Sequence, residues 1–160
     1  MKRRVLKFGG SSVADFTKIK NIAEMLKRRV DDGEQLIVVV SAMGKTTDQL
    51  MENVSHLTTT PKDEELALLL TTGEQQTVSY LSMVLNDIGV SARAMTGYQA
   101  GIKTVGHHLK SRIAEINPET FNKEFKDKDV LVVAGFQGVN DELELTTLGR
   151  GGSDTTAVAL

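Results

Sequence analysis

Hydrophobic positions along the chain follow two alternating periodicities. Short runs rich in Val, Ile and Leu, bounded by glycine or polar clusters, predict strands over residues 5–8, 36–40, 90–95 and 130–134, with a further candidate at 142–147. Apolar residues at helical spacing predict helices over residues 16–30, 47–57, 62–72, 118–125 and 155–160. Residues 71–74 interrupt the pattern, and a further helix is predicted from there to about residue 88. Residues 101–106 are expected to be irregular or a hairpin. Strands that alternate with helices in this way indicate an α/β domain around a mainly parallel sheet.

Three special segments follow directly after predicted strands. Residues 9–12 (Gly-Gly-Ser-Ser) follow the first strand, residues 41–44 (Ser-Ala-Met-Gly) the second, and residues 135–138 (Gly-Phe-Gln-Gly) the fourth. In α/β sheets, ligands bind outside the carboxyl ends of the strands. We therefore expect a ligand site at this edge of the sheet, and the coincidence of all three segments carries more weight than any single motif.

Composition and charge narrow the classes of partner. The 160 residues are 40% hydrophobic and 25% charged, which is ordinary for one globular domain or part of one. The net charge of −2 provides no overall basic field, so neither nucleic acid nor an anionic membrane is expected as a partner. Basic side chains exceed acidic ones within residues 1–30, which we interpret as the solvated face of the helix at 16–30.

Cysteine usage and apolar run length indicate the compartment. The absence of cysteine excludes disulfides, thiolate metal sites and a thiol nucleophile, and it suits a reducing compartment. The longest apolar run, Leu36–Val40, is far shorter than the ~20 residues that a membrane helix needs, and Met1–Arg4 does not lead into a signal-peptide apolar region. We therefore expect a cytoplasmic protein.

The segment Lys7-Phe8-Gly9-Gly10-Ser11 has the composition of a phosphate site. Glycines let backbone N–H groups approach an anion closely, and a lysine ammonium is a compact positive charge. A strand, a glycine turn and a helix also form an ordinary packing turn. Both interpretations stay open for the segment alone, and the lysine favours the phosphate site.

Several other apparent motifs do not indicate a site. Gly44-Lys45-Thr46 resembles the end of a P-loop, but that motif requires glycine at the position of Val39. Gly9 and Gly10 do not fit the dinucleotide fingerprint, so a Walker-type NTPase and a Rossmann dehydrogenase are both disfavoured. The histidines lack carboxylates at metal-ligand spacing, so we assign them surface or structural roles and predict no metal site; they are His56, His107 and His108.

The segment Thr147–Asp154 combines three glycines with two charged side chains. Its glycines precede a predicted helix whose first N–H groups would face an anion, and the planar guanidinium of Arg150 matches a carboxylate. We predict an anion site in which Asp154 holds a lysine or arginine in place. The alternative is a glycine-rich loop with Ser153 as the helix N-cap.

Glu74 and Thr47 each allow two interpretations. The Glu74 carboxylate is placed at a helix start, where the helix dipole stabilises it, or else it meets an ammonium group of a ligand. Thr47 follows the second strand and either caps a helix or contacts the ligand.

Five segments also occur together in a characteristic order. They are Lys7–Val13, Val40–Gly44, Thr72–Glu74, Gly135–Gly138 and Thr147–Asp154. This order resembles that of the aspartokinases, which belong to the amino acid kinase superfamily, and the resemblance extends from Val5 to Leu160. The last segment distinguishes aspartokinases from the related carbamate, acetylglutamate and uridylate kinases.

The resemblance implies a fold and an activity. The fold is the amino acid kinase (carbamate kinase-like) fold, a three-layer α/β/α sandwich. The activity is phosphoryl transfer from ATP with Mg²⁺ to the side-chain carboxylate of L-aspartate, giving 4-phospho-L-aspartate for lysine, threonine and methionine synthesis. A carboxylate is already ionised at neutral pH, so this reaction needs no general base.

The resemblance also implies the site residues. By similarity, Lys7 and Asp154 are catalytic, with Asp154 orienting the catalytic lysines. The residues expected at the ATP phosphates are Lys7, Phe8, Gly9, Gly10 and Ser11. The residues expected at L-aspartate are Ser41, Thr47, Glu74, Phe136, Arg150 and Ser153. Among these, Arg150 clamps the α-carboxylate, Glu74 pairs with the α-ammonium and Phe136 walls the pocket.

The same resemblance implies that residues 1–160 are the N-terminal portion of a longer kinase domain. Aspartokinases continue into a half that holds most contacts to ATP and Mg²⁺, followed by ACT regulatory domains. We expect the parent enzyme to be a homo-oligomer and this chain alone to be inactive. Two alternatives stay open: a non-catalytic aspartate-binding or assembly module, and another amino acid kinase with an acyl or carbamoyl substrate.

Overall fold

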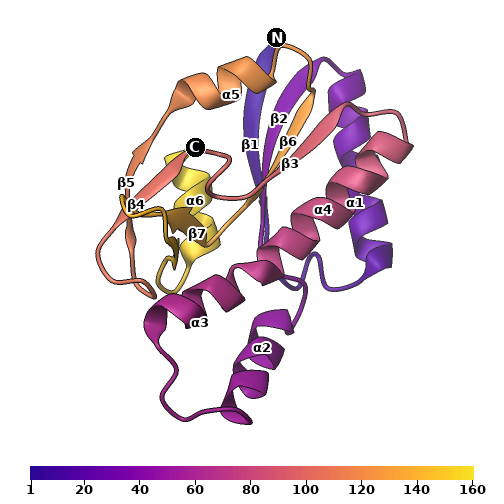
Figure 1. The fold of residues 1–160 in the computed structure, drawn as a ribbon. Helices are drawn as coiled ribbons and strands as arrows, with labels where there is room; N and C mark the ends of the chain where they lie inside the picture. Colours follow the sequence, from indigo (N-terminus) through magenta and orange to yellow (C-terminus); the bar gives the residue numbers. More distant parts are fainter.

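The computed structural model describes residues 1–160 and contains two four-stranded sheets and six helices (Figure 1). The strands are β1 (Lys2–Phe8), β2 (Glu34–Val40), β3 (Ala92–Met95), β4 (Ile102–Val105), β5 (Arg112–Ile116), β6 (Val130–Ala134), β7 (Gln137–Val139) and β8 (Leu145–Thr147). The helices are α1 (Phe16–Asp31), α2 (Thr46–Ser55), α3 (Asp63–Leu70), α4 (Thr72–Asp87), α5 (Pro118–Glu124) and α6 (Gly152–Ala159). The predicted α/β class is confirmed.

The first sheet is entirely parallel, in the order β1-β2-β6-β3. Its register pairs Phe8 with Val40 and Val40 with Ala134, so three neighbouring strands end level with one another. The predicted strand Leu36–Val40 is buried along its whole length, as a strand with both faces covered should be. The segments that follow β1, β2 and β6 therefore start side by side, as the sequence predicted.

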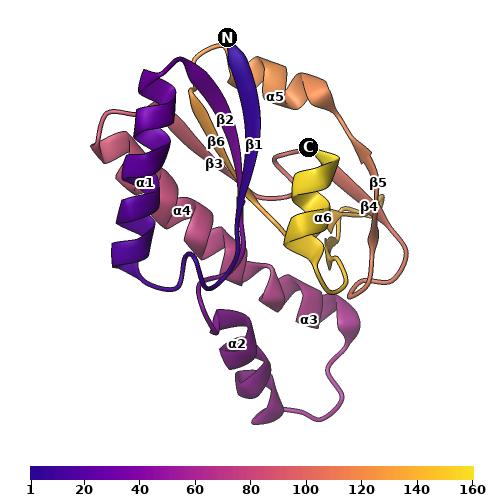
Figure 2. The same cartoon turned by 180° about the vertical axis from the view of Figure 1, so that it is seen from behind.

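Successive residues of β2 and β6 face opposite sides of this sheet and enter two separate hydrophobic cores. Val38 and Val132 pack with side chains of α1 and α4, including Leu26 of α1. Val39 and the other alternate positions pack with α5, with β4 and with the end of α6. Figures 1 and 2 show α1 and α4 on one side of the sheet and α5, α6 and the second sheet on the other. This arrangement confirms the expected three layers.

The second sheet, in the order β5-β4-β7-β8, is mainly antiparallel and was not predicted as a separate sheet. β4 and β5 pair as an antiparallel hairpin, which confirms the hairpin interpretation of residues 101–106. Residues 135–138 were expected to end the strand at 130–134, but a separate strand, β7, begins at Gln137 within them and pairs with β8. Both strands have only three residues, too few to show a period of two in the sequence.

The helix starts decide which residues act as caps. Asp15 caps α1, and its Oδ1 accepts a hydrogen bond from the Lys18 N–H at 2.8 Å. Thr47 does not cap α2, which begins one residue earlier after Lys45. None of the six helices combines the length and apolar character needed to cross a membrane.

Candidate active site

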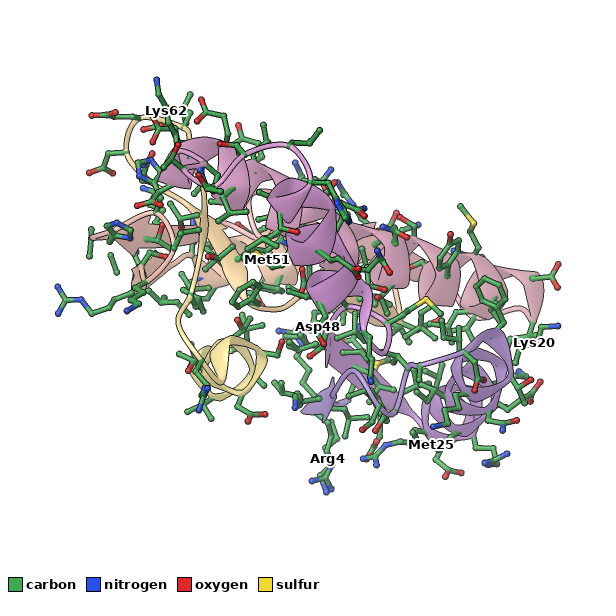
Figure 3. The ribbon with its side chains drawn as sticks, turned by 90° about the horizontal axis from the view of Figure 1, so that it is seen from below. Arg4, Lys20, Met25, Asp48, Met51 and Lys62 are labelled. Atoms are coloured by element: carbon green, nitrogen blue, oxygen red, sulfur yellow. The ribbon has the colours of Figure 1, made fainter.

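A cavity of about 300 Å³ lies at the carboxyl ends of β1, β2 and β6. Seen from this end of the sheet, α2 with Asp48 and Met51 lies between α1, marked by Lys20 and Met25, and α6 (Figure 3). The cavity brings together nine of the residues proposed from the sequence: Lys7, Gly10, Ser41, Thr47, Glu74, Phe136, Arg150, Ser153 and Asp154. They come from five separate segments of the chain, so the fold gathers what the sequence keeps apart.

Three proposed phosphate-binding residues do not line this cavity. The Phe8 side chain packs against the hydrophobic core, and its backbone oxygen accepts a hydrogen bond from the Ser41 N–H at 3.1 Å. Gly9 lies beside Lys7, and a Cβ placed on it would be 3.2 Å from the Lys7 Nζ. Ser11 is exposed at the start of the turn that leads to α1. The Phe8 oxygen is therefore already paired, and Gly9 and Ser11 flank the cavity-lining Gly10 in the sequence without lining the cavity themselves.

Lys7 and Asp154 form an ion pair between the end of β1 and the first turn of α6. The Lys7 Nζ lies 2.9 Å from the Asp154 Oδ1. This contact agrees with the prediction that Asp154 holds a cationic side chain in place. The Asp154 side chain is 69% exposed, so the pair faces the opening of the cavity and is accessible to a ligand.

The turn after β1 presents unpaired backbone donors. The N–H groups of Gly10 and Ser11 donate to no protein oxygen. Gly10 approaches the second loop so closely that a Cβ on it would lie 3.0 Å from the Ala42 oxygen, and its own oxygen accepts from the Gly44 N–H. A side chain at Gly10 would force these loops apart. The turn thus has the close backbone approach and free donors of an anion site.

Glu74 is a buried carboxylate with one unsatisfied oxygen. Its side chain is only 3% exposed; Oε1 accepts from the Ala42 N–H at 3.3 Å, and Oε2 has no partner. Burial raises the pKa of Glu74 to about 7, although hydrogen bonds from its own N–H and that of Ala42 oppose the shift. The sequence argument expected the helix dipole to stabilise this carboxylate, but desolvation dominates. A buried oxygen without a partner is well suited to a cationic ligand group.

The segment that carries Arg150 opens α6 without Ser153 as its N-cap, which was the alternative to the predicted anion site. Gly151, with φ of +76°, is the N-cap residue, and no side chain caps the helix. Ser153 lies inside the first turn, where its Oγ accepts from the Ser41 Oγ at 2.8 Å. Arg150 forms no ion pair in the structure, and the N–H groups of Gly152, Ser153 and Asp154 have no protein acceptor. A free guanidinium therefore lies next to free helix-start donors, which together suit an anion.

Phe136 lies in the wall of the cavity with an unusual backbone conformation. Its φ of +70° is costly for a residue with a side chain, by roughly 1–2 kcal/mol. The conformation is held at both ends, because its N–H donates to the Thr156 Oγ1 at 3.2 Å and its oxygen accepts from the Leu148 N–H at 2.8 Å. A Cβ on Gly152 would lie 2.7 Å from the Phe136 ring. The strained backbone thus keeps the aromatic ring against the start of α6.

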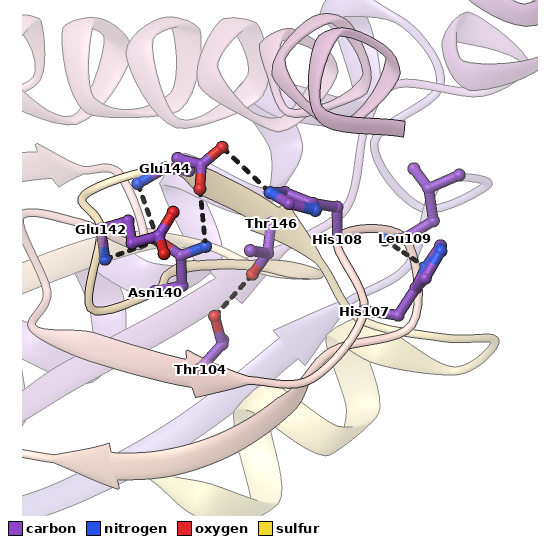
Figure 4. A network of polar contacts seen from close by, with 8 residues as sticks. All are labelled: Thr104, His107, His108, Leu109, Asn140, Glu142, Glu144 and Thr146. Atoms are coloured by element: carbon purple, nitrogen blue, oxygen red, sulfur yellow. Dashed lines mark hydrogen bonds and ion pairs between the residues drawn. The ribbon is translucent and has the colours of Figure 1, made fainter. Parts of the chain in front are cut away.

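Two histidines have carboxylate partners that their spacing in the sequence did not indicate. The Nε2 of His108 lies 3.1 Å from Glu144, which is held in turn by Asn140 (Figure 4). The Nε2 of His107 lies 2.7 Å from Asp63 at the start of α3. These contacts hold the turn between β4 and β5 against α3 and the β7–β8 turn, outside the cavity. They agree with the structural role expected for the histidines.

The Ala42 N–H, which contacts Glu74, was not among the groups predicted from the sequence. This donor comes from the backbone of a small apolar residue, and no side-chain signal could have revealed it. With it included, the cavity combines the cationic groups of Lys7 and Arg150 and the backbone donors of the Gly10 turn with the buried carboxylate of Glu74. Such a site can hold a zwitterionic ligand beside a second anion.

The model of the amino acid kinase family matches residues 2–160. The chain belongs to the amino acid kinase family. Within it, the chain is similar to the aspartokinase of Bacillus sp. (strain MGA3), with 48% identity over 156 residues, and to aspartokinase 2 of Bacillus subtilis (strain 168), with 47%. Each match covers 98% of this chain and 38% of the relative, so the chain spans about two fifths of the length of these curated relatives.

Solved structures give the same assignment. The crystal structure of aspartate kinase from Synechocystis superposes with a TM-score of 0.80 at 43% identity, covering 99% of this chain and 26% of that one. Aspartokinase III from E. coli, in complex with aspartate and ADP, superposes with a TM-score of 0.76 at 20% identity, over 99% of this chain and 46% of that one. The second match supports the fold alone.

Proposed function

We propose that the cavity is the acceptor site of an aspartate kinase and binds L-aspartate. The observation that carries this proposal is the meeting of a free guanidinium, Arg150, and a buried, half-satisfied carboxylate, Glu74, in one cavity of about 300 Å³. An α-amino acid presents the complementary pair, a carboxylate and an ammonium group. The similarity to named aspartokinases at 43–48% identity supports aspartate as that amino acid.

Each polar group of L-aspartate then has a partner. Arg150 and the free N–H groups at the start of α6 bind the α-carboxylate, while the Glu74 Oε2 accepts from the α-ammonium. Ser41, Thr47 and Ser153 contribute hydroxyl contacts, and the Phe136 ring excludes water from one side. The side-chain carboxylate of the substrate is left facing Lys7, where it is already ionised and needs no general base.

The residues at the end of β1 fit the phosphates of ATP. The Lys7 ammonium and the free N–H groups of Gly10 and Ser11 form a donor set suited to phosphoryl oxygens, and Asp154 keeps Lys7 oriented at 2.9 Å. When bound, ATP with Mg²⁺ supplies the phosphoryl group that the acceptor carboxylate receives. Mg²⁺ bound with ATP is held largely by the phosphates and by water, and Asp154 is the one carboxylate beside Lys7 that lies near them.

The proposal concerns a longer protein as well as this chain. Because the chain spans about two fifths of its curated relatives, we propose that residues 1–160 supply the acceptor half of the kinase domain and are inactive alone. The parent enzyme would be a cytoplasmic homo-oligomer that makes 4-phospho-L-aspartate for lysine, threonine and methionine synthesis.

A panel of acceptors tests the choice of substrate. We would measure the thermal unfolding of the chain with L-aspartate, D-aspartate, N-acetyl-L-glutamate and carbamate. Ligand at ~100 times its Kd adds about 2.7 kcal/mol of stability, which raises the Tm of a domain of this size by several degrees. We expect this increase with L-aspartate alone. An increase with N-acetyl-L-glutamate or carbamate, and none with L-aspartate, would favour a different amino acid kinase.

Turnover tests the statement about the isolated chain. Purified chain is incubated with L-aspartate and MgATP, and any acyl phosphate is trapped with hydroxylamine. We expect no product above the level given by Lys7→Ala. Product formation that Lys7→Ala abolishes would support the kinase assignment and overturn the expected inactivity of residues 1–160.

A further inference from the structure

Gln137 is a fully buried polar residue that does not line the cavity, and the proposed function gives it no role. It follows Phe136 in the Gly135–Gly138 segment and is the first residue of β7. Both ends of its side-chain amide are hydrogen-bonded, so its burial carries no unsatisfied group. Its side chain and its backbone contact two parts of the site that lie far apart in the sequence.

The side chain of Gln137 is hydrogen-bonded to the start of α4, the helix that carries Glu74. Its Nε2 donates to the Thr71 backbone oxygen at 3.0 Å, and its Oε1 accepts from the Gly97 N–H at 3.2 Å. Thr71 directly precedes α4, and its oxygen also accepts from the Gln75 N–H at 3.4 Å. Gln137 therefore fixes the first turn of α4, which holds the Glu74 carboxylate.

The backbone of Gln137 pairs with β8, the strand that leads to Arg150. Gln137 pairs with Thr147 in the antiparallel register of β7 and β8. The next backbone contact, from the Leu148 N–H to the Phe136 oxygen, measures 2.8 Å. Arg150 follows two residues later, so the position of its loop depends on this pairing. One residue thus joins both sides of the acceptor pocket.

We propose that Gln137 is a positioning residue that sets the spacing between Glu74 and Arg150, and so selects acceptors that carry both an α-ammonium and an α-carboxylate. The inference rests on the proposed function, because it assumes that these two side chains bind those two groups. Gly97 adds to the constraint. A Cβ there would lie 2.6 Å from the backbone oxygen of Gln137, so the backbone at Gly97 packs directly against β7. The pocket wall cannot shift at one side without breaking these contacts.

The chain provides a matched control in Gln35. This residue is also buried, and its amide also joins distant segments: Nε2 donates to the Phe125 oxygen at 2.9 Å, and Oε1 accepts from the Arg3 Nε at 3.1 Å. It lies at the beginning of β2, at the opposite end of the sheet from the cavity. Gln35→Met therefore removes the same chemistry without touching the site.

The test compares Gln137→Met with Gln35→Met in the full 160-residue chain. Calorimetry measures the affinity for L-aspartate, and NMR titration, which covers weak binding, measures the affinity for succinate. Succinate lacks the ammonium group and so makes no use of Glu74. We expect Gln137→Met to weaken L-aspartate binding roughly tenfold and succinate binding less than twofold, because small displacements of positioning groups have effects of this order. Gln35→Met should change neither affinity by more than twofold.

The outcomes separate this inference from the function on which it rests. If the unmodified chain does not bind L-aspartate, the proposed function fails. If that chain binds L-aspartate and Gln137→Met binds it equally well, or weakens both ligands equally, the positioning role is overturned. Gln137→Glu, which keeps the acceptor for the Gly97 N–H and loses the donor to Thr71, should show the same selective loss if Gln137→Met does not fold. If neither variant folds while Gln35→Met does, Gln137 is a structural requirement and the inference is wrong.

Discussion

Replacing Glu74 by Gln should remove a pH dependence from the stability of the chain. In the folded chain the pKa of Glu74 is raised to about 7 by burial, against an ordinary value of 4.5. Between these two values the folded state holds one proton that the unfolded state has released. Stability is therefore greatest below pH 4.5 and falls as the pH rises toward 7. The difference of about 2.5 pH units corresponds to roughly 3 kcal/mol, and the loss levels off above pH 7.

Urea unfolding between pH 5 and 8 measures this effect. The amide of Glu74→Gln does not titrate, so the unfolding free energy of the variant minus that of the unmodified chain should increase by a few kcal/mol across this range. Taking the difference cancels other carboxylates such as Glu34, whose pKa is lowered by the hydrogen bond from Arg29. A difference that stays constant from pH 5 to 8 would show that Glu74 is ionised throughout and would refute the reasoning.

The same carboxylate predicts the opposite trend for ligand binding. An ionised Glu74 pairs with an ammonium group, whereas a protonated one does not. The affinity for L-aspartate should therefore rise as the pH increases through 7, while the stability of the ligand-free chain falls. Parallel trends in the two quantities would contradict the assignment of Glu74 to the ammonium group.

Three further substitutions have expected results. Lys7→Met breaks the Lys7–Asp154 ion pair. Because this pair is largely exposed, the Tm measured by circular dichroism should fall by no more than the equivalent of ~1 kcal/mol. A much larger fall would show that the pair stabilises the fold more than an exposed ion pair can. Gly135→Ala places a Cβ 2.7 Å from the Ser153 Oγ, and urea unfolding should show a loss of about 1–3 kcal/mol; an unchanged midpoint would mean that α6 moves aside. Leu143 has a φ of +63°, which is strained for a residue with a side chain, and its side chain is 73% exposed. Leu143→Gly removes this strain and should raise the unfolding free energy by roughly 1 kcal/mol. A decrease would show that the contacts of the Leu143 side chain stabilise the fold by more than the strain costs.

The parts of the fold that the sequence predicted are those with long, uniform patterns. Leu36–Val40 has five consecutive apolar residues, so its burial in a parallel sheet followed from the sequence alone. The 16 residues of α1 repeat apolar positions over more than four turns after a capping Asp15. The clustering of the glycine segments followed because parallel strands share one carboxyl edge.

The parts that the sequence did not reveal depend on contacts between distant segments. The strand β7 has three residues, and only its pairing with β8 and β4 identifies it as a strand. The burial of Glu74 depends on the close approach of Ala42, whose backbone N–H donates to it and has no local signal in the sequence. The carboxylate partners of His107 and His108 likewise come from other elements. In each case the pairing, burial or partner of the residue is set by segments distant in the sequence, so the local sequence does not predict it.

The central claim is that Arg150 and Glu74 together form an acceptor site for L-aspartate, and calorimetric titration of the 160-residue chain tests it most directly. The chain is titrated with L-aspartate, with D-aspartate as the stereochemical control, and the L-aspartate titration is repeated with Arg150→Ala. We predict saturable binding of L-aspartate that Arg150→Ala abolishes and that D-aspartate does not reproduce. The absence of L-aspartate binding in a sample shown to be folded by circular dichroism, or equal binding by Arg150→Ala, would contradict the account.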